Sequence, residues 1–242
     1  MLCSHPELSP DSPQIVGRGM MAKAFSKGLV RKRSVVVYAS GVSRSDCFEY
    51  GPFERERALL MASLDQAVIE KPFLYFSTCS TYDPEARDQP YVRHKQAMEG
   101  LVLSHPAGLV VRLPQVAGPN AQSFTLLASL VARIRAGQVV EIWEHALRNV
   151  VDVEDVVRIV DAWLTLPLPV DKVINVANPK SVSVMELVHT IESALGLVAK
   201  VVLVSKGAPY HIDTQPMLNA AALAQVTFGP GYLHRVVRKY FA

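Results

Sequence analysis

The sequence predicts an α/β protein with a mostly parallel sheet. Short apolar runs of strand length alternate with longer amphipathic stretches along the 242 residues, which is the pattern of strands joined by helical crossovers. A glycine-containing turn at 17–19 stands between the first apolar run and the first amphipathic stretch. The chain is 50% hydrophobic and can bury one large core, or one core with a small lobe attached.

The periodicity places the elements in order. In the first half it predicts strands at 14–16, 34–39, 73–77 and 108–113 and helices at 20–30, 53–70, 90–104 and 123–136. Pro90 suits the first turn of its helix, where a missing amide donor costs nothing. In the second half the order is less regular, with strands at 139–143 and 172–176, helices at 153–164 and 184–195, and final segments at 201–204 and 233–241. No internal repeat is present.

Charge excludes an electrostatic nucleic-acid binder. The 25 basic and 22 acidic residues leave a net charge of +3, which is too balanced for that function. The basic run at 31–33 is read first as a solvated helix end, where cations complement the helix dipole. Segment 1–13 is irregular and lacks the apolar core of a signal peptide, and no later stretch of bilayer length is free of charges. We therefore expect no membrane partner.

Cysteine and histidine spacing excludes a disulfide framework and a metal site. Cys3, Cys47 and Cys79 are odd in number, widely spaced and without a Cys-x-x-Cys motif. The histidines have no ligand spacing. We expect a reducing, cytoplasmic location and no metal.

The turn Gly17-Arg18-Gly19-Met20-Met21-Ala22 has the composition of a phosphate-binding turn. Its glycines allow a pyrophosphate to approach the backbone, and a helix N-terminus supplies positive potential. An ordinary tight turn would have the same residues. The position after the first strand and upstream of Tyr91 favours dinucleotide binding.

Tyr91 and Lys95 are four residues apart and share one face of the predicted helix. A tyrosine hydroxyl titrates near pH 10, so its use as a base at neutral pH requires a shift of about three units, roughly 4 kcal/mol, which a nearby ammonium can supply. Thr78 lies upstream at the end of a predicted strand. The three residues suggest proton transfer coupled to redox chemistry at a sugar carbon. Alternatively, Thr78 only caps a strand end, and Tyr91 and Lys95 are a surface pair without a catalytic role.

Taken together, these motifs resemble the extended short-chain dehydrogenase/reductase family, the NAD-dependent epimerases and dehydratases acting on nucleotide sugars. The resemblance runs from Gln14 nearly to the end of the chain. It rests on stretches in the family's order: 36–43 (VVYASGVS), 76–82 (FSTCSTY), 91–95 (YVRHK), 111–120 (VRLPQVAGPN), 148–156 (RNVVDVEDV), and 175–178 (NVAN) leading to Glu186.

The resemblance implies a Rossmann-type doubly wound parallel sheet, reduced in strand number, with a small C-terminal substrate lobe. We expect a dinucleotide-binding core at 14–119, joined by 153–176, and a mainly substrate-binding region at 120–242. The implied function is an NAD(P)-dependent nucleotide-sugar epimerase or ketoreductase in polysaccharide or lipopolysaccharide sugar biosynthesis. The resemblance also implies a homodimer, paired through the helix at 53–70 and the helix that ends near Gly100.

The resemblance assigns roles to residues. Thr78 would bind the reacting hydroxyl or carbonyl, Tyr91 would move its proton, and Lys95 would stabilise the phenolate and bind the nicotinamide ribose. The implied cofactor contacts are Gly17, Arg18, Gly19, Met20, Met21, Ala39, Ser40, Gly41, Tyr91, Lys95, Pro114 and Val116. The implied substrate contacts are Val42, Ser43, Cys79, Gln115, Asn120 and Arg148, with Arg148 clamping a diphosphate. Cys79 could alternatively be an acid in epimerisation or a small core residue.

The chain also departs from the family. Few residues separate the first helix from the strand at 34–39, where the family places two strands, a helix and an acidic residue that binds the adenosine ribose. Cys79 and Ser80 stand where the dehydratases carry an acidic pair, which disfavours 4,6-dehydration. The cofactor is therefore expected to be NAD or NADP, with NADP at least as well accepted. A sensor or partner subunit that binds nucleotide sugar or dinucleotide without turnover is the alternative function.

Overall fold

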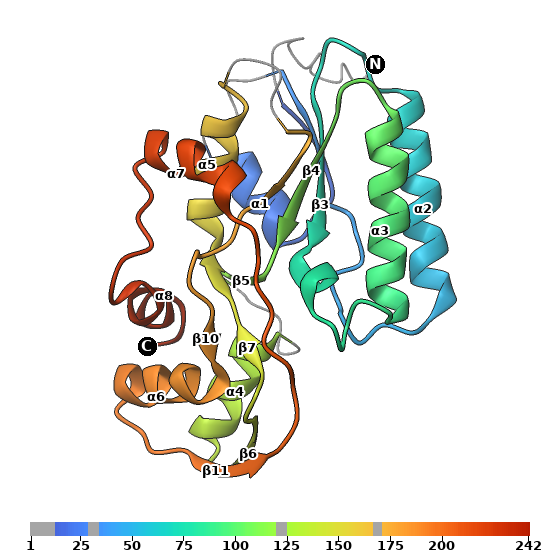
Figure 1. Ribbon diagram of the computed structural model, residues 1–242. Helices are drawn as coiled ribbons and strands as arrows, with labels where there is room; N and C mark the ends of the chain where they lie inside the picture. Colours follow the sequence, from blue (N-terminus) through green and yellow to red (C-terminus); the bar gives the residue numbers. More distant parts are fainter. Residues whose placement is uncertain (1–12, 29–33, 120–124, 167–170) are drawn as a thin grey trace, which may run out of the picture.

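The computed structural model describes residues 13–28, 34–119, 125–166 and 171–242 (Figure 1). Its centre is a parallel sheet of five strands in the order β1-β2-β3-β4-β9. The strands are β1 (Gln14–Val16), β2 (Val36–Tyr38), β3 (Phe73–Thr78), β4 (Gly108–Leu113) and β9 (Val173–Asn175). The predicted α/β class and the Rossmann-type parallel sheet are confirmed.

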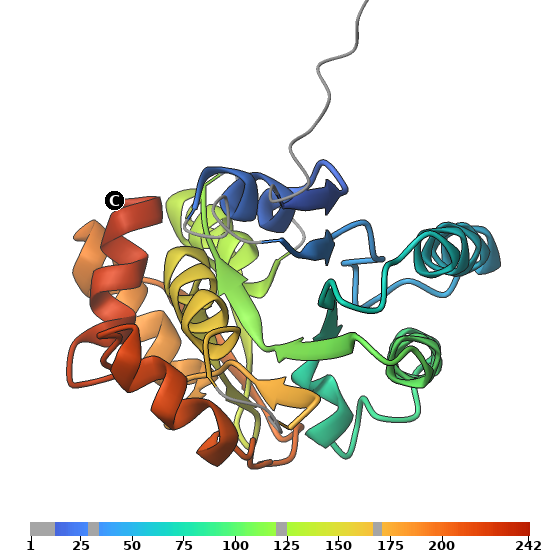
Figure 2. The same ribbon diagram turned by 90° about the horizontal axis from the view of Figure 1, so that it is seen from above.

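Helices cover both faces of this sheet (Figure 2). Strand residues alternate between the two faces, so Leu74 and Phe76 belong to one core while Phe73 and Tyr75 belong to the other. The first core is closed by α1 (Met20–Lys27), α5 (Val153–Trp163) and α7 (Leu218–Leu223), and the second by α2 (Tyr50–Asp65) and α3 (Pro90–Ser104). The central strands are buried on both sides, which explains their continuous apolar runs.

Strand β1 and helix α1 form an unusual unit. The strands advance in one direction from β1 to β4, yet α1 lies on the opposite face from α2 and α3. The β1-α1-β2 unit therefore has the opposite hand from the two units that follow. Such crossovers are right-handed in about 98% of cases, so the first unit is the left-handed exception. Among the described residues β1 pairs with β2 alone, so it is the edge strand of this sheet.

A second lobe follows β4 and has its own core. Its elements are β5 (Gln115–Ala117), α4 (Leu126–Arg135), β6 (Val139–Trp143), β7 (Leu147–Arg148), β8 (Val150–Asp152), β10 (Val182–Ser183), α6 (Val184–Leu195), β11 (Lys200–Val204) and α8 (Tyr232–Phe241). The strands pair as β5-β8, β6-β11 and β7-β10. Ser183 caps the start of helix α6, where its hydroxyl accepts from the Glu186 amide, and Gly196 caps the end in the left-handed conformation.

Helix α8 is held by the carboxylate of Asp152. That carboxylate accepts hydrogen bonds from Lys239 Nζ (2.8 Å) and Tyr240 Oη (2.6 Å), and it also caps α5 through the Glu154 amide. The Tyr232 hydroxyl donates to Asp155 Oδ2 at 2.9 Å. One short acidic segment therefore fixes the end of the chain to the start of α5.

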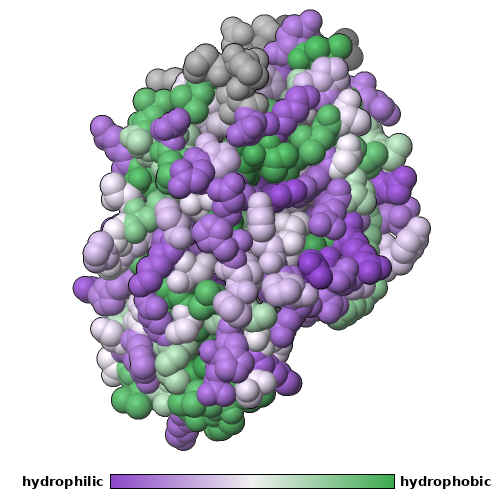
Figure 3. Space-filling view, in the orientation of Figure 1, coloured by the Kyte–Doolittle hydropathy of each residue, from purple (hydrophilic) through white to green (hydrophobic). Residues whose placement is uncertain are grey.

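Strand β11 exposes successive apolar side chains at the lower tip of the molecule (Figure 3). Val201, Val202 and Leu203 are 40%, 52% and 54% exposed. In the part of the chain that the structure describes, no helix is both long and apolar enough to span a bilayer.

Helix α2 ends earlier than its pattern predicts, at Asp65 instead of Glu70. Its 16 residues span about 24 Å, which already exceeds the roughly 20 Å of the six-residue strand β3. Residues after Leu64 form turns through the Ala67 and Lys71 amides and bring Pro72 to the start of β3.

Candidate functional site

The predicted site residues follow the carboxyl ends of the parallel strands, where ligands bind in open α/β sheets. Residues 17–21 follow β1, 39–43 follow β2, Cys79 follows β3 and 114–116 follow β4. Thr78 is the last residue of β3, and Tyr91 and Lys95 lie in the first turns of α3. The topology therefore places the predicted cofactor and catalytic residues along one edge of the sheet.

Thr78 is held in place by its neighbour Ser80. The Thr78 hydroxyl donates to Ser80 Oγ at 3.0 Å and accepts from the Ser80 amide at 3.1 Å, which caps the short 3-10 helix at Cys79–Tyr82. Tyr91 is buried nearby. Burial raises the pKa of Tyr91 well above its usual value, and a hydrogen bond with Thr78 offsets part of that rise. Tyr91 is thus a neutral phenol, and its pKa rises instead of falling as the neighbouring Lys95 led us to expect.

Lys95 belongs to a buried cluster around Glu56 of α2. Its Nζ donates to Glu56 Oε1 (3.1 Å), Tyr75 Oη (2.9 Å) and the Phe76 carbonyl (3.2 Å). Glu56 also accepts from Tyr75 Oη at 2.6 Å and from the Val42 amide at 2.6 Å, and its Oε2 lies 3.0 Å from His94 Nε2. The lysine predicted from sequence therefore has a carboxylate partner that the sequence did not reveal.

The hydrogen bonds fix the charges in this cluster. Three acceptors surround Lys95 Nζ, so all three protons of an ammonium are used. Four donors surround the Glu56 oxygens, which leaves no place for a carboxyl proton and makes His94 Nε2 a donor. Burial lowers the pKa of Lys95, and the Glu56 carboxylate opposes that effect. Burial also disfavours ionised Glu56, but these donors outweigh it and lower the pKa of Glu56 to about 2.

This cluster predicts an acid-sensitive contribution to stability. Glu56 has a pKa of about 2 in the folded protein and about 4.3 in an unfolded chain, so its ionisation stabilises the fold by about 3 kcal/mol. That contribution is complete above about pH 4.5 and is lost as the pH falls toward 2. We therefore expect the difference in free energy of unfolding between the parent and Glu56→Gln to shrink between pH 5 and pH 3, as measured by urea unfolding.

Glu54→Gln removes an exposed carboxylate from the same helix and is the charge-matched control. A difference between parent and Glu56→Gln that stays constant over this pH range would contradict the assignment of Glu56 as an ionised hydrogen-bond acceptor.

The turn after β1 fits a pyrophosphate. Gly17 has φ +132°, and a Cβ there would lie 2.4 Å from the Ala39 carbonyl oxygen, so glycine is needed for the ends of β1 and β2 to approach. Gly19 is the N-cap of α1 without a side-chain cap, and a Cβ on it would meet nothing within 4 Å. The open, uncapped helix start offers backbone N–H groups to an anion. Arg18 is exposed beside it.

The adenosine side has less support. Among the described residues no strand pairs with β1 on its outer side, so the strand that would carry a ribose-binding acidic residue is missing there. The basic run at 31–33 and the predicted substrate contact Asn120 lie outside the described residues. The described residues therefore fit the nicotinamide and pyrophosphate half of a dinucleotide better than the adenosine half.

The segment after β4 approaches the glycine turn. Pro114, Gln115 and Val116 are partly buried. A Cβ on Gly118 would lie 2.5 Å from the Met20 sulfur, so the start of α1 packs directly against this segment. Met21 joins the core beneath. Of the residues after β2, Ala39, Ser40, Gly41 and Val42 are partly buried and Ser43 is exposed.

Arg148 belongs to the second lobe and influences a tyrosine that packs near Cys79. It lies on β7, half-buried, with Nη1 donating to the Leu147 carbonyl at 2.7 Å. Burial raises the pKa of Tyr210 to about 12, and the charge of Arg148 opposes that rise. Tyr210 also packs against the cluster that contains Cys79. The segment 207–214 thus connects Arg148 to the residue next to Thr78, a link that the sequence did not predict.

Cys79 is 1% exposed, and burial raises the pKa of its thiol far above the usual value. It packs with Ala177 and Ile212. These observations favour the packing role over the proton-donor role for Cys79. Among the described residues, no group of three His, Cys, Asp or Glu side chains could hold a metal ion.

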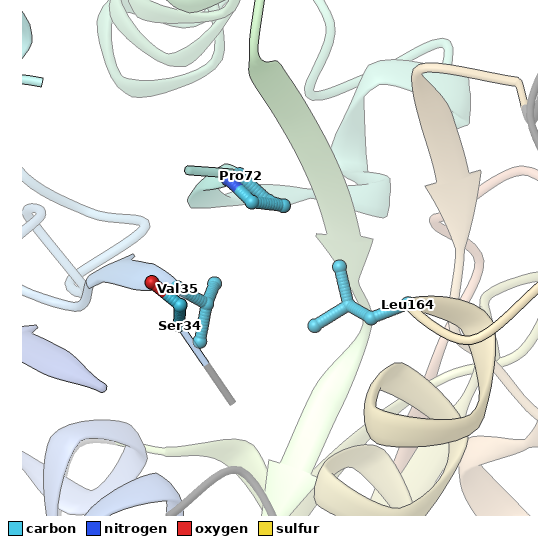
Figure 4. A pocket seen from close by; sticks show the side chains of 4 residues that line it. All are labelled: Ser34, Val35, Pro72 and Leu164. Atoms are coloured by element: carbon cyan, nitrogen blue, oxygen red, sulfur yellow. The ribbon is translucent and has the colours of Figure 1, made fainter. Parts of the chain in front are cut away.

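A small hollow of about 230 Å³ lies at the other end of the sheet (Figure 4). Ser34, Val35, Pro72 and Leu164 line it. Val35 and Pro72 precede β2 and β3, so the hollow faces the amino ends of the strands. It is therefore separate from the site that contains Thr78.

A family model matches residues 39–177 of the chain and carries the description NAD dependent epimerase/dehydratase family. The match covers more than half of the chain. The chain belongs to this family. The match includes Thr78, Tyr91, Lys95 and Arg148, whereas the glycine turn at 17–19 lies outside it. A search of curated protein sequences finds no significant match.

Solved structures with the same fold include enzymes of nucleotide-sugar metabolism. UDP-glucuronic acid 4-epimerase from Bacillus cereus, in complex with UDP-glucuronic acid and NAD, has a TM-score of 0.66 at 18% identity, covering 90% of this chain and 76% of that one. dTDP-glucose 4,6-dehydratase from Bacillus anthracis, in complex with NAD, has a TM-score of 0.64 at 18% identity, with coverages of 86% and 73%. RMD from Pseudomonas aeruginosa, complexed with NADPH, has a TM-score of 0.68 at 16% identity, with coverages of 94% and 95%. At these identities the likeness is one of fold.

Proposed function

We propose that this protein is an NAD(P)-dependent nucleotide-sugar epimerase or ketoreductase of polysaccharide or lipopolysaccharide sugar biosynthesis. The observation that carries the proposal is the placement of Thr78, Tyr91 and Lys95 at the carboxyl edge of the sheet that also bears the glycine turn. Family membership and the ligands named for the structural neighbours support it.

Thr78, Tyr91 and Arg148 have different roles in the proposed reaction. Thr78, fixed by Ser80, orients the sugar oxygen and the Tyr91 hydroxyl. Tyr91, as a neutral phenol, donates its proton to a sugar carbonyl oxygen and takes it back in the reverse direction. A bound nicotinamide ring would supply the hydride chemistry. Arg148 would hold the diphosphate of the substrate from the second lobe, since guanidinium binds phosphate oxygens in a bidentate manner.

The cofactor would be held by the residues on the sheet edge. The α1 N-terminus and Gly17 would receive the pyrophosphate, Arg18 would lie beside it, and residues 39–41 with 114–116 would border the nicotinamide. Among the described residues, no strand next to β1 on its outer side supplies an acidic side chain for the adenosine ribose. Such a side chain would select NAD over NADP.

We accordingly expect NADPH to bind at least as tightly as NADH, and both to bind weakly. Fluorescence titration of the two at one ionic strength tests this, since a tenfold preference corresponds to about 1.4 kcal/mol. Arg18→Gln should weaken NADPH more than NADH if Arg18 contacts the 2′-phosphate. NADH binding tenfold tighter than NADPH would show that another acidic group replaces the lost one.

A second candidate function is a sensor or partner subunit that binds nucleotide sugar or dinucleotide without turnover. One observation favours it: all three N–H groups of Lys95 are used by protein acceptors, so none is left for a ribose in this arrangement. Retention of Thr78 and Tyr91 beside Lys95 favours the enzyme.

Native mass spectrometry of freshly purified protein, followed by assays with UDP, GDP and dTDP sugars, separates the two functions. A retained dinucleotide together with turnover of one sugar supports the enzyme. A retained ligand without turnover of any sugar in the panel supports the binding protein. The same spectra test the proposed homodimer, for which the neighbouring helices α2 and α3 are the expected interface (Figure 1).

A further inference from the structure

We propose that Glu56 is a positioning residue for Lys95: its buried carboxylate holds the ammonium and the 39–43 segment together and so determines how well the nicotinamide side of the site binds a dinucleotide. The inference deepens the proposed function and rests on it. It starts from hydrogen bonds around a glutamate that no motif in the sequence marks as functional.

Glu56 connects four separate parts of the fold. It comes from α2 and accepts from the Val42 amide after β2, from Tyr75 on β3 and from Lys95 on α3. The distances are 2.6, 2.6 and 3.1 Å, and Glu56 is 1% exposed. The carboxylate is therefore the common anchor of the catalytic helix and the loop that would border the cofactor.

The cofactor loop also packs against this ion pair. A Cβ on Gly41 would lie 2.6 Å from Lys95 Nζ and 2.8 Å from Glu56 Oε1, so the loop backbone covers both charged groups closely. Any movement of Lys95 would disturb Gly41 and Val42, which lie on the predicted nicotinamide side. The Val42 amide donates to the same carboxylate, and the side-chain oxygen of a glutamine at position 56 can accept that bond as well.

His94 strengthens the same anchor from the other side. Its Nε2 donates to Glu56 Oε2 at 3.0 Å, and its ring stacks on Phe53 with centroids 4.5 Å apart. Lysine has a long side chain with many rotamers, so fixing its ammonium requires directional partners. The two Glu56 carboxylate oxygens accept from Lys95 and from three further donors, which fixes the carboxylate and so the ammonium.

The chain offers a matched control in a second ion pair, whose glutamate hydrogen-bonds to Arg112 instead of Lys95. Glu99, also on α3, is 4% exposed and forms a bidentate pair with Arg112 at 2.9 and 2.6 Å. Glu56→Gln and Glu99→Gln each remove one buried negative charge while keeping side-chain shape. Both variants should lose stability, because Glu56→Gln leaves the buried Lys95 and Glu99→Gln the partly buried Arg112 without a counter-charge.

Dinucleotide binding should distinguish the two variants. We expect Glu56→Gln to weaken NADPH about tenfold, and Lys95→Met to do the same, with Glu99→Gln within about twofold of the parent. The double variant Glu56→Gln/Lys95→Met removes both charges and avoids an unpaired buried cation. It should bind NADPH no more weakly than Lys95→Met alone, because Glu56 acts through Lys95.

NADPH fluorescence titration gives the dissociation constants for this cycle without any sugar substrate. Additive effects of the two substitutions would overturn the proposal, as would equal weakening by Glu99→Gln and Glu56→Gln. If the parent protein binds NADPH but converts no nucleotide sugar, the proposed enzymatic function is wrong. The dissociation constants of the single and double variants still decide the role of Glu56 in that case. Parent protein that binds neither NADPH nor NADH would overturn both.

Discussion

Replacing Tyr91 by phenylalanine should lower turnover of the nucleotide sugar by at least about a hundredfold, the low end for loss of a general acid/base group. The substitution removes only a hydroxyl, so the buried ring keeps its packing against Phe53 and Val92. Dinucleotide affinity should change little, because the proton-transfer group acts in the chemical step. Steady-state kinetics with the best sugar from the panel, combined with NADPH titration, measure both quantities.

Tyr240→Phe is the control for loss of a tyrosine hydroxyl, since Tyr240 lies on α8 in the second lobe and donates to Asp152 at the end of β8. It should affect stability and leave turnover close to the parent value. Lys95→Met should differ from Tyr91→Phe by weakening the dinucleotide as well as the rate. If Tyr91→Phe turns over nucleotide sugar as fast as the parent, Tyr91 is not the proton-transfer group.

Replacing Arg148 by alanine should weaken nucleotide-sugar binding by about 2–3 kcal/mol, or roughly a hundredfold, if its guanidinium clamps the substrate diphosphate. Arg148 is half-buried on β7 and influences the pKa of Tyr210, which packs against the cluster that contains Cys79. Free sugar phosphates should bind far more weakly than the diphosphates. Calorimetry with the panel of UDP, GDP and dTDP sugars measures these affinities.

Arg133 provides the matched control, because it is an exposed arginine in the last turn of α4 in the same lobe. Arg133→Ala removes the same charge and should leave the affinity within about twofold. Equal affinity of Arg148→Ala and the parent for the best ligand would remove Arg148 from the substrate site.

By itself, the sequence determined the elements whose pattern is local. Pro90 and the 3.6-residue periodicity fixed α3 at 90–104, and the continuous apolar run of β4 fixed it at 108–113. The order of the motifs also indicated the family and the trio Thr78, Tyr91 and Lys95. These features depend on neighbours a few residues apart, which a sequence displays directly.

Only the tertiary structure decided what lies next to that trio. Glu56 is 39 residues from Lys95 in the chain and is one of several glutamates and arginines on its helix, so nothing local marks it as the buried partner. The contact between Tyr210 and the Cys79 cluster, and the opposite hand of the β1-α1-β2 unit, likewise depend on how distant elements pack. Burial converts such contacts into shifted pKa values and fixed charges, because charge interactions strengthen where water is excluded.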